Sequence, residues 1–165
     1  LDNFRVALSW AEKEDPALGL RLAAALVGYW FTRGVVREGR DWLDRFLAAL
    51  REAISVSGKT ACVIAAGELA HLGMRYGDKV PPTDFSFHRA MQYDLEMLKH
   101  VEDLKPEEFM GYIQKEKDQR RISGFSPIYC LLRLIQAEKG QVLRYDRGIT
   151  DQYNSTVTYA SMSFF

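Results

Sequence analysis

The sequence lacks the features that mark several large classes of protein. It has two cysteines in 165 residues, and neither Cys62 nor Cys130 has a Cys-x-x-Cys partner. Both lie in apolar runs, where a free thiol behaves as a small buried hydrophobe, which favours a reducing compartment. No apolar run approaches the roughly 18 residues of a membrane span, and no signal segment opens the chain. We therefore predict a cytoplasmic protein that does not associate with membranes.

Net charge is absent as well. Lys and Arg together number 22, as do Asp and Glu, which leaves a formal net charge of +0. Without a net positive field the chain has no long-range attraction to nucleic acid. The most basic cluster, residues 115–121, is interrupted by Glu116 and Asp118. We interpret this cluster as a solvated helix end and expect no direct contact with nucleic acid.

What is present is a globular balance of 47% hydrophobic and 27% charged residues, which can fill a core. Alanine is abundant up to Ala70 and rare after the Pro81-Pro82 pair. We therefore predict two units, residues 1–82 and 83–165, which could still pack directly on each other. The chain begins at Leu1 without Met, which favours a piece of a longer protein.

The stretch from Pro16 to Leu50 organises the first unit. It predicts two helices folded into a hairpin about Gly34, because apolar residues recur at three-and-four spacing after the glycine. The apolar face of the second helix consists of Val35, Gly39, Trp42, Leu43, Phe46, Leu47 and Leu50. The opposite face carries Arg37, Glu38, Arg40, Asp41, Asp44 and Arg45. Such a hairpin leaves an apolar flank that needs a neighbour.

Further helices are predicted on both sides of this hairpin. Residues 2–14 form one, and Asp15-Pro16 supplies a cap followed by proline at the first helical position of the next. Residues 60–76 predict a fourth helix. Leu22–Gly34 can be laid against Ile64–Gly77 at an offset of about 42 residues, a spacing typical of helical-pair repeats.

Several of these residues also carry a family resemblance. They are Asp2, Asn3, Arg5, Ala7, Leu8 and Trp10, then 20–26, then Tyr29, Trp30 and Gly34, and finally Glu38, Gly39, Arg40, Trp42 and Leu43. In this pattern the run of residues 2–50 resembles the segment that opens the tetratricopeptide-like array of LuxR- and AfsR-type bacterial regulators, which are built on a signal-transduction NTPase core. The next predicted helix is similar to the next helix of such arrays. After Pro82 the resemblance stops.

The resemblance implies a non-catalytic interaction or sensor module of a larger bacterial signalling or transcription regulator. Its expected partner is a protein or peptide, or another domain of the parent chain, held by the aromatic residues Tyr29, Trp30 and Trp42. The competing interpretation is that these aromatics belong to the core. A free edge of the array would favour a homodimer. No cofactor and no metal ion are expected.

The second unit has its own signals. Asp84, Lys105-Pro106 and Ser126-Pro127 each mark the start of a helix. Residues 141–165 alternate β-branched and aromatic residues, which predicts a short β-hairpin or an extended tail. The fold class predicted for the whole chain is mainly α, with antiparallel helical hairpins in a repeat-like array and this β-like tail.

Motifs with a chemical meaning are incomplete. Residues 57–60, Ser-Gly-Lys-Thr, end like a phosphate-binding loop, but Ala53 stands where that loop needs its first glycine. Glu68 and His71 would share a helical face, which is half of a dinuclear carboxylate metal site, and Glu96 with His100 could form one edge of another. No nucleophile motif is present.

An alternative function remains open beside the interaction module. Residues 83–165 are richer in Tyr, His, Arg and Asp, and could hold a small-ligand-binding or enzymatic site. Its polar groups would be His88, Tyr93, Arg133 and Tyr145. A pocket on which these side chains converge would favour this alternative.

Overall fold

The computed structural model describes residues 2–165, apart from the side chains of Val27, Gly28, Phe31, Thr32 and Val36. The chain divides into two compact units between Val63 and Ile64, which is earlier than the predicted boundary at residue 82. We refer to residues 2–63 as unit 1 and to residues 64–165 as unit 2. The described part of the chain contains six α-helices and a three-stranded sheet. The expectation of a mainly α fold with a C-terminal hairpin is therefore confirmed.

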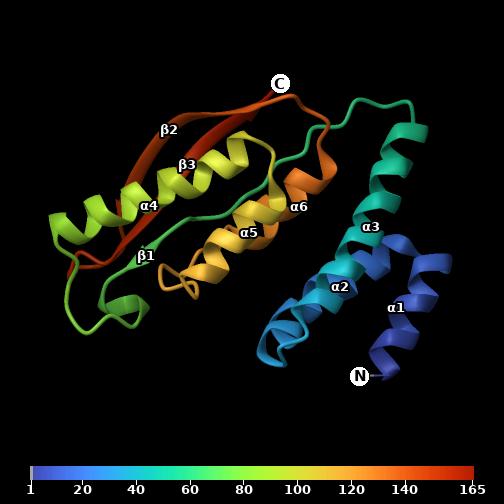
Figure 1. The fold of residues 1–165 in the computed structure, drawn as a ribbon, viewed down its shortest axis with the longest axis horizontal. Coiled ribbons are helices and arrows are strands. Elements are labelled where there is room, and N and C mark those ends of the chain that lie inside the picture. The colour runs from blue at the N-terminus through green and yellow to red at the C-terminus, as the bar shows by residue number, and fades with distance from the viewer. Residues whose placement is uncertain (1) are drawn as a thin grey trace. The chain divides into compact units, whose positions relative to one another are not determined.

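Unit 1 consists of α1 (Asp2–Glu14), α2 (Pro16–Thr32) and α3 (Val36–Val56) (Figure 1). These are the three helices that the sequence predicts. Their contact faces share one apolar cluster, formed by Leu8, Ala11, Ala23, Leu26, Trp30, Trp42 and Phe46. The spacing of apolar residues on α3 therefore predicted correctly that Trp42 and Phe46 belong to the core of this unit.

Local capping chemistry fixes the start and end of α2. The Asp15 carboxylate accepts a hydrogen bond from the Leu18 amide at 2.9 Å, as expected for a residue that caps a helix N-terminus. At the other end, Gly34 has φ +70°, and the Val35 amide donates to the Trp30 carbonyl at 3.0 Å. This is the glycine-terminated arrangement that closes many helices. The hairpin turn at Gly34 is confirmed.

The predicted fourth helix, residues 60–76, is wrong. These residues run extended into a short strand β1 (His71–Leu72), followed by a 3-10 turn η1 (Met74–Tyr76). Tertiary hydrogen bonds override the local helical signal, because the Leu69 amide donates to the Thr158 carbonyl at 2.8 Å and the Thr158 amide donates to the Ala70 carbonyl at 2.9 Å. The segment laid against residues 22–34 as a second repeat therefore contains no α-helix.

The sheet of unit 2 has the order β1-β3-β2, with both pairs antiparallel. Strands β2 (Gly140–Ile149) and β3 (Thr156–Phe164) form the predicted C-terminal hairpin, with a register shift between Val142 and Arg144. The Asp151 carboxylate accepts from the amides of Tyr153 and Ser155, both at 2.9 Å. This side chain holds the turn between the two strands.

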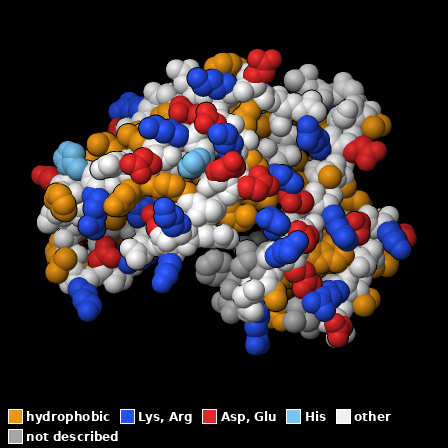
Figure 2. Space-filling view, in the orientation of Figure 1, with side chains coloured by type: hydrophobic (Ala, Val, Ile, Leu, Met, Phe, Trp, Pro, Cys, Tyr) orange, Lys and Arg blue, Asp and Glu red, His pale blue; other side chains and the backbone are white. Residues whose placement is uncertain are grey.

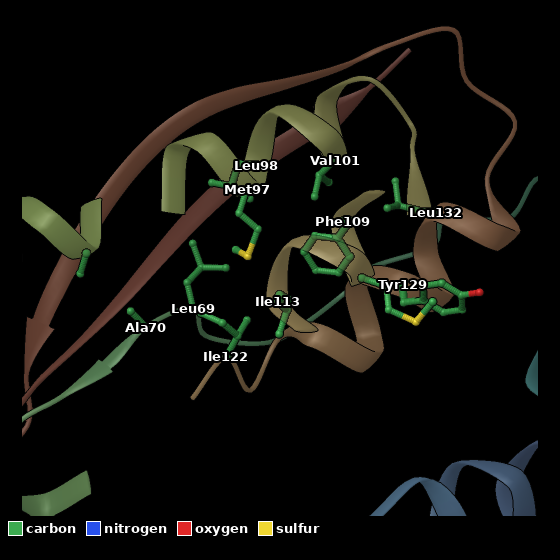
Figure 3. Close-up of a cluster of buried hydrophobic side chains, with 12 residues drawn as sticks. Leu69, Ala70, Met97, Leu98, Val101, Phe109, Ile113, Ile122, Tyr129 and Leu132 are labelled. Carbon is green, nitrogen blue, oxygen red and sulfur yellow. The ribbon is translucent and has the colours of Figure 1, made fainter. Parts of the chain in front are cut away.

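Unit 2 also contains three helices, α4 (Asp84–Glu102), α5 (Pro106–Lys115) and α6 (Phe125–Leu134), and α4 packs along β2 (Figure 1). The core between them includes Leu69, Met97, Leu98, Val101, Phe109, Ile113, Ile122, Tyr129 and Leu132 (Figure 3). The predicted start of α5 at Pro106 is confirmed, whereas Thr83 rather than Asp84 caps α4. Within residues 2–165 the structure has no helix long and apolar enough to cross a membrane.

Candidate functional site

The aromatic residues predicted to bind a partner lie in the core of unit 1. Trp30 is 3% exposed and Trp42 is 8% exposed. The Trp30 ring faces Gly39, and the half-buried Tyr29 ring meets Phe4 edge-to-face at 5.7 Å between ring centroids. Packing inside unit 1 thus accounts for all three residues. Their role in binding a partner stays a prediction.

The most chemically suggestive side chains lie in unit 2, where β1 begins. His71 Nδ1 is 3.1 Å from the Leu69 carbonyl, and His71 Nε2 is 3.1 Å from Glu68 Oε2. The imidazole side chain is 12% exposed, whereas the Glu68 side chain is 52% exposed. The sequence indicated this pair through helical spacing. The structure brings the two side chains together instead at the bend that leads into a strand.

The neighbours of this pair fix its position. The Tyr76 ring meets the His71 ring edge-to-face at 4.8 Å. The Ser123 hydroxyl lies 3.2 Å from both the Glu68 amide and the Glu68 carbonyl. The Arg121 guanidinium donates to the His71 carbonyl at 2.9 Å and to Asp78 at 2.7 Å. Sequence reasoning missed Ser123 and Arg121 because they come from a loop about 50 residues away along the chain.

The two ring nitrogens of His71 face different partners. Nδ1 faces the Leu69 carbonyl, which can only accept a hydrogen bond, and Nε2 faces the Glu68 carboxylate. An imidazole held beside a carboxylate is a combination that general acid–base sites use.

The loop that supplies these neighbours is strained. Lys117, Asp118 and Arg121 have φ values of +55°, +49° and +56°, in the left-handed region that side chains disfavour. The Asp118 carboxylate accepts from the Ile122 amide at 2.8 Å, which supports this conformation. Strain of this kind gathers at functional sites and persists where the surroundings impose it. The predicted basic helix end at residues 115–121 is therefore an ordered loop.

A buried polar network lies behind this loop. Asp94 on α4 accepts from Arg120 and from the hydroxyls of Thr158 at 2.5 Å and Tyr145 at 2.7 Å. Arg120 also donates to Glu116, with the shortest contact at 2.6 Å. Burial raises the pKa of Asp94, while Arg120, Thr158 and Tyr145 oppose that rise. The network connects to the pair, because the His71 amide donates to the Arg120 carbonyl at 2.7 Å.

The four residues proposed from sequence for a second-unit site do not all converge. Tyr145 bonds Asp94, and the Arg120 guanidinium carbon lies 5.9 Å from the centre of the Tyr93 ring, so these two tyrosines share the network. His88 is exposed and bonds the Asp84 carbonyl, and Arg133 pairs with Glu107 at 3.2 Å. Those two residues lie elsewhere in unit 2.

Metal-ligand chemistry is limited to pairs. Among residues 2–165, no group of three or more His, Cys, Asp or Glu side chains is arranged to hold a metal ion. The other pair of metal ligands predicted from sequence, Glu96 and His100, has different contacts. Glu96 accepts from the Tyr112 hydroxyl at 3.0 Å, and His100 packs against the Tyr112 ring. Cys62 is an exposed free thiol, contrary to its expected burial, and Cys130 is partly buried.

Together these features define a helix-covered antiparallel sheet that carries a polar centre, rather than a helical repeat. The chain belongs to the Memo-like protein family, whose model matches residues 36–163. This match starts in α3 of unit 1 and runs through nearly all of unit 2. No protein of curated function matches the chain.

The family match corrects the identification made from sequence. The resemblance to the tetratricopeptide-like arm of LuxR- and AfsR-type regulators is wrong, and so is the function in signalling and transcription that it implied. That resemblance rested on helix-packing residues, which recur wherever amphipathic helices pair. The part of the chain after Pro82, for which sequence reasoning found no relative, falls within the family match.

Proposed function

We propose that unit 2 binds a small molecule that carries a hydroxyl or amine group, and that the Glu68–His71 pair contacts this group. The observation that carries the proposal is the 3.1 Å contact between His71 Nε2 and a carboxylate that is half-exposed. A ligand hydroxyl or amine can donate a hydrogen bond to the half-exposed carboxylate of Glu68. The alternative considered from sequence placed ligand binding or catalysis in residues 83–165. The centre proposed here differs from it, because Glu68 and His71 precede that range and only their neighbours Arg121 and Ser123 lie within it.

The strained loop supports this proposal. Arg121 and Ser123 hold the backbone on both sides of the pair, so the pair is positioned before a ligand arrives. Sites of this kind use few polar groups placed by a rigid scaffold. The buried Asp94 network supplies such a scaffold, since its members come from α4, β2, β3 and the loop after α5.

A ligand screen tests the proposal. The full chain is heated in the presence of a panel of small phenols, alcohols and amines, and the unfolding temperature of the chain is recorded by circular dichroism. A compound at about 100 times its dissociation constant stabilises the fold by about 2.7 kcal/mol. We expect at least one compound to raise the unfolding temperature of the wild type and to lose this effect in Glu68→Gln and His71→Gln. The exposed histidine variant His88→Gln should respond like the wild type.

Two outcomes would contradict the proposal. One is that no compound of the panel stabilises the wild-type chain. The other is that a stabilising compound acts equally on both variants of the pair. Unfolding of each variant without a compound shows whether it folds.

A further inference from the structure

Unit 1 contains a hollow that is lined by its own residues. Its volume is about 690 Å³, and α1 and the first half of α3 line it. Three arginine side chains face it, Arg5 from α1 and Arg37 and Arg45 from α3. Val35 and Trp42 supply an apolar wall. The hollow therefore combines positive charge with an apolar surface.

The positive charge is only partly neutralised. Arg5 donates to both oxygens of Glu38, at 2.7 and 2.8 Å, and its hydrogen bond to the carboxylate lowers the pKa of Glu38. Asp41 also lines the hollow, but its carboxylate lies 3.7 Å from Arg40. On the face of this unit that Figure 2 shows, basic side chains (Lys or Arg) and acidic side chains (Asp or Glu) are interspersed.

Two arginines remain available to a ligand. Arg37 is exposed and forms no hydrogen bond or ion pair with the part of the chain that the structure describes. The Arg45 guanidinium carbon lies 4.9 Å from the centre of the Trp42 ring, and its nearest ion-pair contact, with Glu12, is 3.6 Å long. Stacking on Trp42 holds the Arg45 guanidinium at the apolar wall while leaving its N–H donors largely free.

We propose that this hollow binds a small organic anion, a phosphate monoester of an aromatic or apolar group. Arg37 and Arg45 hold the phosphate, because a guanidinium presents several N–H donors in the geometry that phosphate oxygens accept. The apolar part lies against Val35 and Trp42. Glu38 opposes binding by its negative charge, which Arg5 offsets.

Calorimetric titration of the full chain with three probes tests this proposal: phenyl phosphate, inorganic phosphate and phenol. We expect phenyl phosphate to bind more tightly than either other probe. Because hydrogen bonds to charged groups contribute about 1.5–3 kcal/mol, Arg37→Gln and Arg45→Gln should each weaken binding at least about tenfold. Arg51→Gln, which removes an exposed arginine of α3 outside the hollow, should leave binding unchanged. Glu38→Gln should strengthen it.

Several results would overturn the proposal. Phenyl phosphate could fail to bind the wild type, inorganic phosphate could bind as tightly as the ester, or Arg51→Gln could weaken binding as much as Arg37→Gln. Weaker binding in Glu38→Gln would also contradict the proposal. Removing the negative charge should strengthen phosphate binding, whereas a general loss of structure would weaken it. Far-ultraviolet circular dichroism shows whether each variant keeps its helices.

Discussion

Asp94 on α4 and Arg120 in the loop after α5 form an ion pair inside unit 2, where they are 0% and 6% exposed. Removing one member leaves the other charge buried, which costs about 3–5 kcal/mol. We therefore expect Arg120→Leu to lower the unfolding free energy of unit 2 by about this amount, measured by urea unfolding.

The double variant Asp94→Leu/Arg120→Leu should lose less than the sum of the two single variants, because neither charge is then left alone. Arg144→Gln is a matched control, since Arg144 pairs with Asp146 on the surface and its side chain is 78% exposed. It should change stability by less than about 0.5 kcal/mol. Equal losses of unfolding free energy in Arg120→Leu and Arg144→Gln would contradict the expected contribution of the buried ion pair to stability.

Replacing glycine with alanine should change stability in opposite directions at two positions, which gives a second prediction. A Cβ atom at Gly39 would lie 2.4 Å from Cε3 of the Trp30 ring, whereas one at Gly111 in α5 would meet nothing within 4 Å. Gly39→Ala should destabilise unit 1 by about 1–3 kcal/mol through overpacking. Gly111→Ala should stabilise unit 2 by about 0.5–1 kcal/mol.

The measurement can separate the two units. All three tryptophans, Trp10, Trp30 and Trp42, lie in unit 1, so tryptophan fluorescence follows its unfolding. Far-ultraviolet circular dichroism follows both units. A Gly39→Ala variant with unchanged fluorescence unfolding would contradict the packing of Trp30 described above.

The core of unit 2 gives a third prediction. Phe109 is fully buried at 0% exposure and packs at the centre of the cluster in Figure 3. Phe109→Ala should cost unit 2 about 3–5 kcal/mol, the sum of lost transfer free energy and the cavity left behind. Phe85→Ala serves as the control, because Phe85 is 73% exposed. This variant should lower the unfolding free energy far less. Comparable losses of unfolding free energy in Phe109→Ala and Phe85→Ala, measured by urea unfolding, would contradict the burial of Phe109 in this core.

The Arg5–Glu38 pair gives a prediction about pH. Its hydrogen bond lowers the pKa of Glu38 below the ordinary value of 4.5. A carboxylate with a lowered pKa in the folded state stabilises the fold above its unfolded pKa, and this contribution disappears as the pH falls through the folded pKa. We expect the stability of unit 1 to decline below about pH 4.5. The decline should be smaller in Glu38→Gln, as measured by fluorescence-detected urea unfolding at several pH values.

Sequence reasoning found part of the candidate site but misjudged its geometry. The spacing of Glu68 and His71 was noticed as a helical pair, and the two side chains do meet, although no helix contains them. The same reasoning noticed Arg121 only as part of the basic cluster at residues 115–121, and it did not find Ser123, because their contacts with Glu68 and His71 join segments 50 or more residues apart. The left-handed backbone of their loop becomes visible only in three dimensions.

The sequence by itself determined the helices of unit 1, the Asp15 cap and Gly34 turn at the two ends of α2, and the C-terminal hairpin. Those features depend on contacts between residues a few positions apart, such as the Asp15 cap, which local patterns record. Only the tertiary structure decided that residues 60–72 are extended and that Asp94 is buried with partners 26, 51 and 64 residues away. Hydrogen bonds to β3 and the desolvation of a buried charge depend on which distant segments meet, and that is settled by the packing of the whole unit.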